Sequence, residues 1–192
     1  MQATVDVPDS GATSQEQQAA VGEVADTDAY NWGYDPFHYT TPEGSYAVKQ
    51  YGGERTAEYR DMVGNLHSAG YQVVQDVVYN HTYAHGQDEK SVFEKIVPGY
   101  YHRLGYEGQT LTTPCCGEFA TEHAMAEELM VNSLLTWAKA YKVDGFRFDL
   151  MEFNSVDTMK RIRAELDSLT LDKDGVDGSQ MYLYGEGWNF GE

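Results

Sequence analysis

The chain has 192 residues, with 13 lysines and arginines against 31 aspartates and glutamates, and its formal net charge is −18 at pH 7. Such a charge argues against binding to nucleic acid or to an anionic membrane surface, because both are themselves negative. No apolar run is long enough to span a bilayer, and the first residues lack the basic and apolar regions of a secretory signal. The length allows one domain with a sizeable core. The 15 tyrosines and 19 glycines favour loops that hold flat, hydroxylated ligands.

The first part of the chain, residues 1–29, is rich in Gln, Ala, Ser, Thr, Asp and Glu. Within it, residues 15–24 could form a short helix, but they carry no clear apolar stripe. We therefore expect a poorly structured insertion or linker here, with the folded domain occupying residues 30–192.

An aromatic loop at residues 30–39 opens this domain. Apolar residues at helical spacing then predict a helix over residues 56–69, closed by Gly70 as a left-handed cap. The β-branched run at 73–78 predicts a buried strand, which ends in the polar residues Asn80 and His81.

A connection of about forty residues, 83–122, is well beyond the usual loop length and is typical of an ordered functional loop. It contains the only cysteines, Cys115 and Cys116. Two adjacent cysteines do not have the usual spacing of a metal site, so none is predicted. A disulfide between neighbours would be strained, and two free thiols are at least as plausible. Apolar residues at three- and four-residue steps then predict a core helix over 123–141.

The central stretch of the sequence is the apolar run at 143–151, which predicts a buried strand carrying Arg147 and Asp149. Because side chains two apart on a strand share a face, the two should point the same way. A strand-end carboxylate beside a guanidinium is a candidate nucleophile, and a structural ion pair is the alternative.

The last elements are a helix over residues 155–169, capped by Asn154 or Ser155, and a third buried strand within 181–188 that ends in the carboxylate Glu186. Alternating helices and strands predict an α/β fold with parallel strands. In a (β/α)8 barrel the carboxyl ends of the strands form the catalytic face, and adjacent strands would bring Asp149 and Glu186 together. Two carboxylates ~5–5.5 Å apart suit a retaining glycosidase.

Three stretches resemble sequence regions of the α-amylase superfamily: 76–81 (DVVYNH), 145–149 (GFRFD) and 185–188 (GEGW). They would stand at the ends of barrel strands 3, 4 and 5. The stretch 30–36 (YNWGYDP), together with 95–101 and the ending at 149–151, resembles the type I pullulanase and limit dextrinase group. The resemblance runs from about residue 29 to the end of the chain, and it implies a partial (β/α)8 TIM barrel.

The resemblance also implies roles for seven residues. Asp149 matches the nucleophile, Glu186 the general acid/base, and Arg147 the arginine that keeps the nucleophile ionised and oriented. Three residues match substrate-binding positions. His81 matches a histidine that hydrogen-bonds the sugar, Tyr34 an aromatic platform beneath the sugar, and Trp188 a ring on the acceptor side. Asp76 matches a structural acid near the site.

The implied activity is hydrolysis of α-1,6 branch points in pullulan, amylopectin and limit dextrins. No cofactor takes part in that chemistry; calcium is a common structural ion in the superfamily, but no calcium ligand is assigned here. The alternatives are an α-1,4-acting amylase or neopullulanase relative, and a non-catalytic glycan-binding barrel. The presence of Arg147, Asp149 and Glu186 argues against the last.

The departures from the superfamily pattern concern the two ends of the chain. The third carboxylate of the superfamily lies in a later His-Asp motif that does not follow Glu186, and the first two strands are absent upstream. We therefore expect an internal piece of a larger enzyme, inactive and marginally folded alone. The oligomeric state is not predicted. The location stays open, with a secreted or cell-envelope site as the guess from bacterial relatives.

Overall fold

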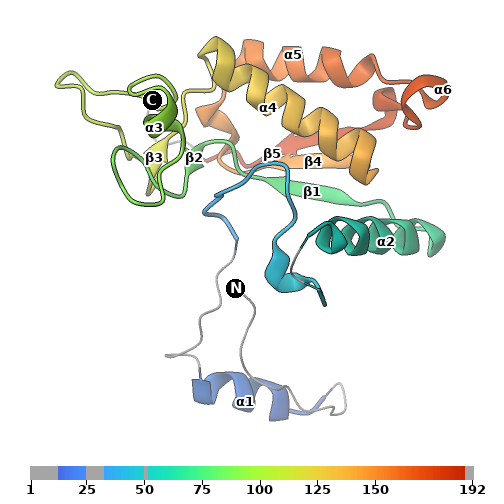
Figure 1. The fold of residues 1–192 in the computed structure, drawn as a ribbon. Helices are drawn as coiled ribbons and strands as arrows, with labels where there is room; N and C mark the ends of the chain where they lie inside the picture. The colour runs from blue at the N-terminus through green and yellow to red at the C-terminus, as the bar shows by residue number, and fades with distance from the viewer. Residues whose placement is uncertain (1–12, 25–32, 50–51, 189–192) are drawn as a thin grey trace.

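A three-stranded parallel sheet forms the centre of the protein in the computed structural model, which describes residues 13–24, 33–49 and 52–188. Its strands are β1 (Val74–Val77), β4 (Gly145–Phe148) and β5 (Tyr182–Gly185), in the order β1-β4-β5 (Figure 1). Phe148 pairs with Val77 on one side and Gly185 on the other. The three carboxyl ends therefore lie level with one another, and the predicted α/β class with parallel strands is confirmed.

The helices alternate with these strands along the chain. Helix α2 (Glu54–Ser68) precedes β1, and α4 (Ala124–Thr136), extended by the π-helical turn η2 (Trp137–Tyr141), precedes β4. Helix α5 (Val156–Asp167) and the short α6 (Leu171–Asp174) connect β4 to β5. Figure 1 shows α4 and α5 lying together over one side of the sheet, with α2 near the start of β1. The sheet is thus flanked by helices, as the alternation predicted.

Two predicted helix ends are confirmed in detail. Gly70 follows α2 with φ +86°, and its N–H donates to the His67 carbonyl, so it terminates the helix in the left-handed conformation. At the start of α5, the Ser155 side chain accepts a hydrogen bond from the Thr158 N–H at 3.0 Å. Such a cap satisfies a backbone donor that the first helical turn would otherwise leave unpaired.

The core lies between β4 and the two long helices. Its largest fully buried side chains include Phe146 and Phe148 of the strand and the helical residues Met130, Leu134, Ile162 and Leu166. These are positions of the predicted apolar stripes. Val156 of α5 is an exception among the apolar helical residues: it is 69% exposed because it occupies the first helical position, at the end of the element.

The expectation of three buried strands holds only for β4. Strand β1 exposes Val74 at 39%, and β5 exposes Tyr182 at 64% and Tyr184 at 43%. Within the described residues, β4 is the sheet neighbour of both, so each has one unpaired edge. Composition predicted the strands correctly, but it does not reveal which strand has neighbours on both sides.

The predicted long loop is a folded unit. Strand β2 (His81–Thr82) pairs antiparallel with β3 (Gly117–Glu118), and α3 (Phe93–Ile96) packs its Phe93 ring against Tyr101 and Phe119. Beneath them, buried His102 bonds Glu94 through Nδ1 at 2.9 Å and Thr82 through Nε2 at 2.8 Å. Figure 1 shows β2 and β3 beside the ends of the parallel strands, and His81 is the first residue of β2.

The remaining elements are short. Helix α1 (Glu16–Val24) lies in the segment expected as a linker and stands apart from the sheet in Figure 1; most of 1–29 lies outside the described residues. Single turns occur at η1 (Gly44–Tyr46), η3 (Met151–Phe153) and η4 (Gly178–Gln180). No helix among the described residues has both the length and the apolar character needed to cross a bilayer.

Candidate active site

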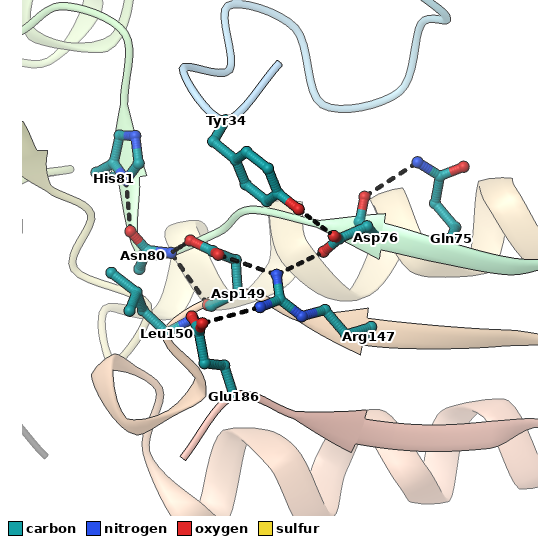
Figure 2. A network of polar contacts seen from close by, with 9 residues as sticks. All are labelled: Tyr34, Gln75, Asp76, Asn80, His81, Arg147, Asp149, Leu150 and Glu186. Atoms are coloured by element: carbon teal, nitrogen blue, oxygen red, sulfur yellow. Dashed lines mark hydrogen bonds and ion pairs between the residues drawn. The ribbon is translucent and has the colours of Figure 1, made fainter. Parts of the chain in front are cut away.

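One guanidinium group joins the carboxyl ends of all three parallel strands. Arg147 Nη1 lies 2.9 Å from Asp76 Oδ1 and 3.0 Å from Asp149 Oδ1, while Nη2 lies 3.1 Å from Glu186 Oε1 (Figure 2). Their side chains turn toward one another on the same side of the sheet. The period of two within β4 explains why Arg147 and Asp149 share a face, and the parallel register explains why Asp76 and Glu186 reach them.

Asp149 is held from the opposite side by a buried amide. Asn80 Nδ2 donates to the Asp149 carboxylate oxygen Oδ2 at 2.9 Å and to its backbone carbonyl at 3.0 Å. Asn80 is fully buried, so its rotamer is fixed by packing. The Asp149 side chain is only 13% exposed and has two polar partners of different kinds. The carboxylate therefore has one defined orientation at the end of the sheet.

Glu186 depends on an unusual backbone conformation next to Asp149. Leu150 has φ +42° and ψ +55°, in the left-handed region that a leucine rarely occupies, and its N–H donates to Glu186 Oε2 at 3.2 Å. Burial opposes ionisation of Glu186, but hydrogen bonds from Trp188 and Leu150 and the charge of Arg147 outweigh it and lower the pKa of this carboxyl. With no substrate bound, the carboxylate form is favoured.

An aromatic ring lies beside the acids. The Tyr34 hydroxyl donates to Asp76 Oδ2 at 2.6 Å, and the Arg147 guanidinium carbon is 5.9 Å from the ring centre. The hydrogen bond to Asp76, then burial, raises the pKa of Tyr34 to about 12, so its hydroxyl remains a donor at neutral pH. The ring is 38% exposed, which leaves part of it open to a ligand.

The last two predicted residues lie at the edges of this network. His81 is 3% exposed and hydrogen-bonds Asn80 through Nδ1. Trp188 is 60% exposed and hydrogen-bonds Glu186. The structure thus brings together all seven residues to which the sequence resemblance gives a role. Part of the aromatic loop, residues 30–32, lies outside the described residues.

Two contributors to the site were missed. Asn80 was noted only as the polar end of a strand; a polar residue directly after a buried run is the signal that could have marked it. The backbone N–H of Leu150 has no sequence signal, because left-handed leucine is set by tertiary contacts. Next to the network, a cavity of about 780 Å³ extends along the open edge of β1, between the segment at 33–46 and α2.

Comparison with known proteins identifies close relatives. The chain is 48% identical over 180 residues to pullulanase 1, chloroplastic, of Arabidopsis thaliana, which covers 93% of this chain and 19% of the relative. It is 45% identical over 169 residues to a pullulanase of Klebsiella pneumoniae, which covers 86% of this chain and 15% of that relative. In the segment that it spans, the chain belongs to the type I pullulanase group. It matches no protein-family profile.

Solved pullulanase structures share the fold. The Klebsiella pneumoniae pullulanase complexed with maltotriose matches with a TM-score of 0.78 at 44% identity, covering 90% of this chain and 16% of that one. Type I pullulanase of Bacillus subtilis complexed with maltose matches with a TM-score of 0.74 at 36% identity, covering 83% of this chain and 21% of that one. The chain therefore spans about a fifth or less of the length of these pullulanases.

Proposed function

We propose that this chain supplies the nucleophile and the general acid/base of a pullulanase-type glycoside hydrolase that cleaves α-1,6 linkages in branched α-glucans with retention of configuration. The observation that carries the proposal is the single guanidinium of Arg147, bonded to both Asp149 and Glu186. An arrangement of this kind keeps two carboxylates within reach of one glucose unit, in environments different enough to divide the labour.

The reaction has two displacements. In the first, an Asp149 oxygen attacks the anomeric carbon while Glu186 gives its proton to the departing glycosidic oxygen, and a glycosyl ester on Asp149 results. In the second, Glu186 takes a proton from water, which attacks the same carbon and releases Asp149. Although burial opposes ionisation, hydrogen bonds from Trp188 and Leu150 and the charge of Arg147 lower the pKa of Glu186 overall, and the first step requires the protonated form of this carboxyl.

The remaining residues hold the sugar. Tyr34 provides an apolar ring face beneath the glucose at the cleaved bond, where a sugar C–H face can pack against it. His81 donates to or accepts from its hydroxyl groups, and Trp188 stacks on the acceptor side. Asp76 positions both Tyr34 and Arg147 through its two oxygens. Relatives of this kind need no cofactor for hydrolysis, and no calcium ligand is assigned.

The barrel assignment forms part of the same proposal. Residues 30–192 would contribute strands 3, 4 and 5 of a (β/α)8 catalytic barrel, and residues 1–29 a linker or insertion. The parallel order β1-β4-β5, with one open edge on each side, supports this arrangement, and so does the likeness to pullulanase structures. In such a barrel the polar strand ends lie on the catalytic face.

Product analysis tests the proposal. The full natural chain is incubated with pullulan, and the products are separated. Maltotriose supports α-1,6 cleavage, whereas panose would indicate an α-1,4-acting relative, and no product would favour a glycan-binding protein. The variants Asp149→Asn and Glu186→Gln are each expected to lower kcat by about 10³-fold or more while the protein stays folded, since both preserve shape. Near-normal turnover in either variant would overturn the assignment of roles.

A further inference from the structure

A second polar cluster lies beside the carboxylate network and shares only His81 with the residues proposed to bind the sugar. It consists of Asp35, His81, Cys115 and Cys116, which come from the segment at 33–49, the start of β2 and the approach to β3. Each residue offers one ligand atom, and the four atoms all lie within 4.8 Å of one another. Both cysteines are free thiols.

The separations are those of a small metal site. His81 Nε2 is 3.4 Å from Asp35 Oδ1 and 4.0 Å from Cys115 Sγ, and Cys116 Sγ is 3.7 Å from Asp35 Oδ1. Tetrahedral zinc with bonds of ~2.0 Å to nitrogen or oxygen and ~2.3 Å to sulfur needs ligand atoms roughly 3.3–3.8 Å apart. These three distances need to change by only a few tenths of an ångström, and the remaining pairs, all within 4.8 Å, need to close by about 1 Å at most.

The histidine is already oriented as a ligand. The amide nitrogen of Asn80 donates to Asp149, so its Oδ1 faces His81 and can only accept. The proton of His81 therefore sits on Nδ1, which leaves the lone pair of Nε2 directed at the cluster. A hydrogen bond of this kind to the non-ligating nitrogen is typical of metal-binding histidines. At 3% exposure, the ring has little freedom to turn away.

The ligand types select the metal. Two sulfurs and an imidazole suit a borderline or soft cation, whereas calcium and magnesium take oxygen ligands. We propose that Asp35, His81, Cys115 and Cys116 bind one Zn²⁺ ion when the thiols are reduced, and that bound zinc stops glycoside hydrolysis. The second half rests on the proposed function, because zinc would occupy the Nε2 atom with which His81 would otherwise meet the sugar. Two Cys–H protons are released as the two Zn–S bonds form.

Metal binding is measured directly, on the full natural chain reduced with a phosphine and freed of metal. Co²⁺ serves as the probe, because tetrahedral cobalt–thiolate sites show visible bands and a thiolate charge-transfer band. We expect one equivalent of Co²⁺ to give both, and Zn²⁺ to displace it stoichiometrically. Cys115→Ser and Cys116→Ser should each weaken zinc binding by about 100-fold or more. The control Asp172→Asn, at an exposed carboxylate in α6, should bind as the parent does.

The outcomes separate the two halves of the inference. Several equivalents of zinc bound with equal affinity by the parent and the double cysteine variant would mean adsorption to an acidic surface and would overturn the site. A charge-transfer band without loss of pullulan hydrolysis would refute only the inhibition. Inhibition is scored against the metal-free rate of each variant. Stoichiometric, cysteine-dependent binding by a protein that hydrolyses no α-glucan would support the metal site while refuting the proposed function.

Discussion

Replacing Arg147 by methionine tests the electrostatic basis of the proposed site. Methionine keeps much of the side-chain length and removes the charge that lies 3.0 Å from Asp149 and 3.1 Å from Glu186. Unit charges ~4 Å apart attract by about 1 kcal/mol in water and about 4 kcal/mol at an effective dielectric constant of ~20. The three side chains are 13–24% exposed, so the attraction between each pair should lie between these two energies.

We therefore assign about 1–2 kcal/mol of lost stabilisation to each of the two carboxylates, or about 2–4 kcal/mol together. At ~1.36 kcal/mol for each factor of ten, kcat/KM should fall by about 30- to 900-fold. The pKa of Glu186 should rise, because the charge of Arg147 is one of the causes that lower it. The limb of the pH–rate profile that reports Glu186 should therefore move to higher pH.

The assay is hydrolysis of pullulan by the full natural chain across a pH series, with Tm recorded for each variant. Arg161→Met is the matched control: Arg161 also bridges two acids, Glu127 and Glu128, but on the helices α4 and α5. Arg161→Met should leave kcat/KM within about twofold of the parent value, because surface ion pairs contribute little to stability and these lie away from the site. If Arg147→Met retains kcat/KM within about threefold and an unmoved pH profile, the electrostatic reasoning is wrong.

Three further predictions concern stability. Because folding lowers the pKa of Glu186 from 4.5, the ionised carboxyl stabilises the protein above that pH, and this contribution is lost as pH falls through the folded pKa. The stability difference between the parent and Glu186→Gln, measured by urea unfolding, should therefore be largest near neutrality and vanish in acid. Gly64→Ala, at an exposed position in α2 with open space around the added methyl, should stabilise the protein by about 0.5–1 kcal/mol. Gly178→Ala should destabilise the protein, because its methyl would overlap the Leu166 carbonyl oxygen. Equal Tm shifts in the two variants would contradict both expectations. Ser155→Ala should cost about 1 kcal/mol through loss of the α5 cap, with kcat/KM unchanged.

The network around Arg147 was predictable because it depends on local periodicity. Residues two apart on a strand share a face, so Arg147 and Asp149 had to point together. The alternation of helices and strands implied a parallel sheet, and a parallel sheet places successive strand ends side by side. That placed Glu186 and the residues after β1 at the same edge, without knowledge of any tertiary contact.

What the sequence did not reveal depends on contacts between distant segments. The burial of β1 and β5 was overestimated because an apolar strand looks the same whether it is central or at an edge. The segment 83–122 contains few long apolar runs, yet Phe93 and Phe119 give it a small core of its own. The cysteine pair lacks metal-site spacing along the chain, because Asp35 and His81 are brought to it only by the fold.

The most direct test of the central claim is to trap the glycosyl-enzyme intermediate. The full natural chain is treated with a fluorinated maltosyl fluoride, whose ring fluorine slows both displacements while the good leaving group lets the first one proceed. The labelled protein is digested and its peptides are sequenced by mass spectrometry. The account predicts one glycosyl group per chain, attached to Asp149, and none in Asp149→Asn. A label on Glu186 or on another residue, or turnover with no covalent species, would contradict it.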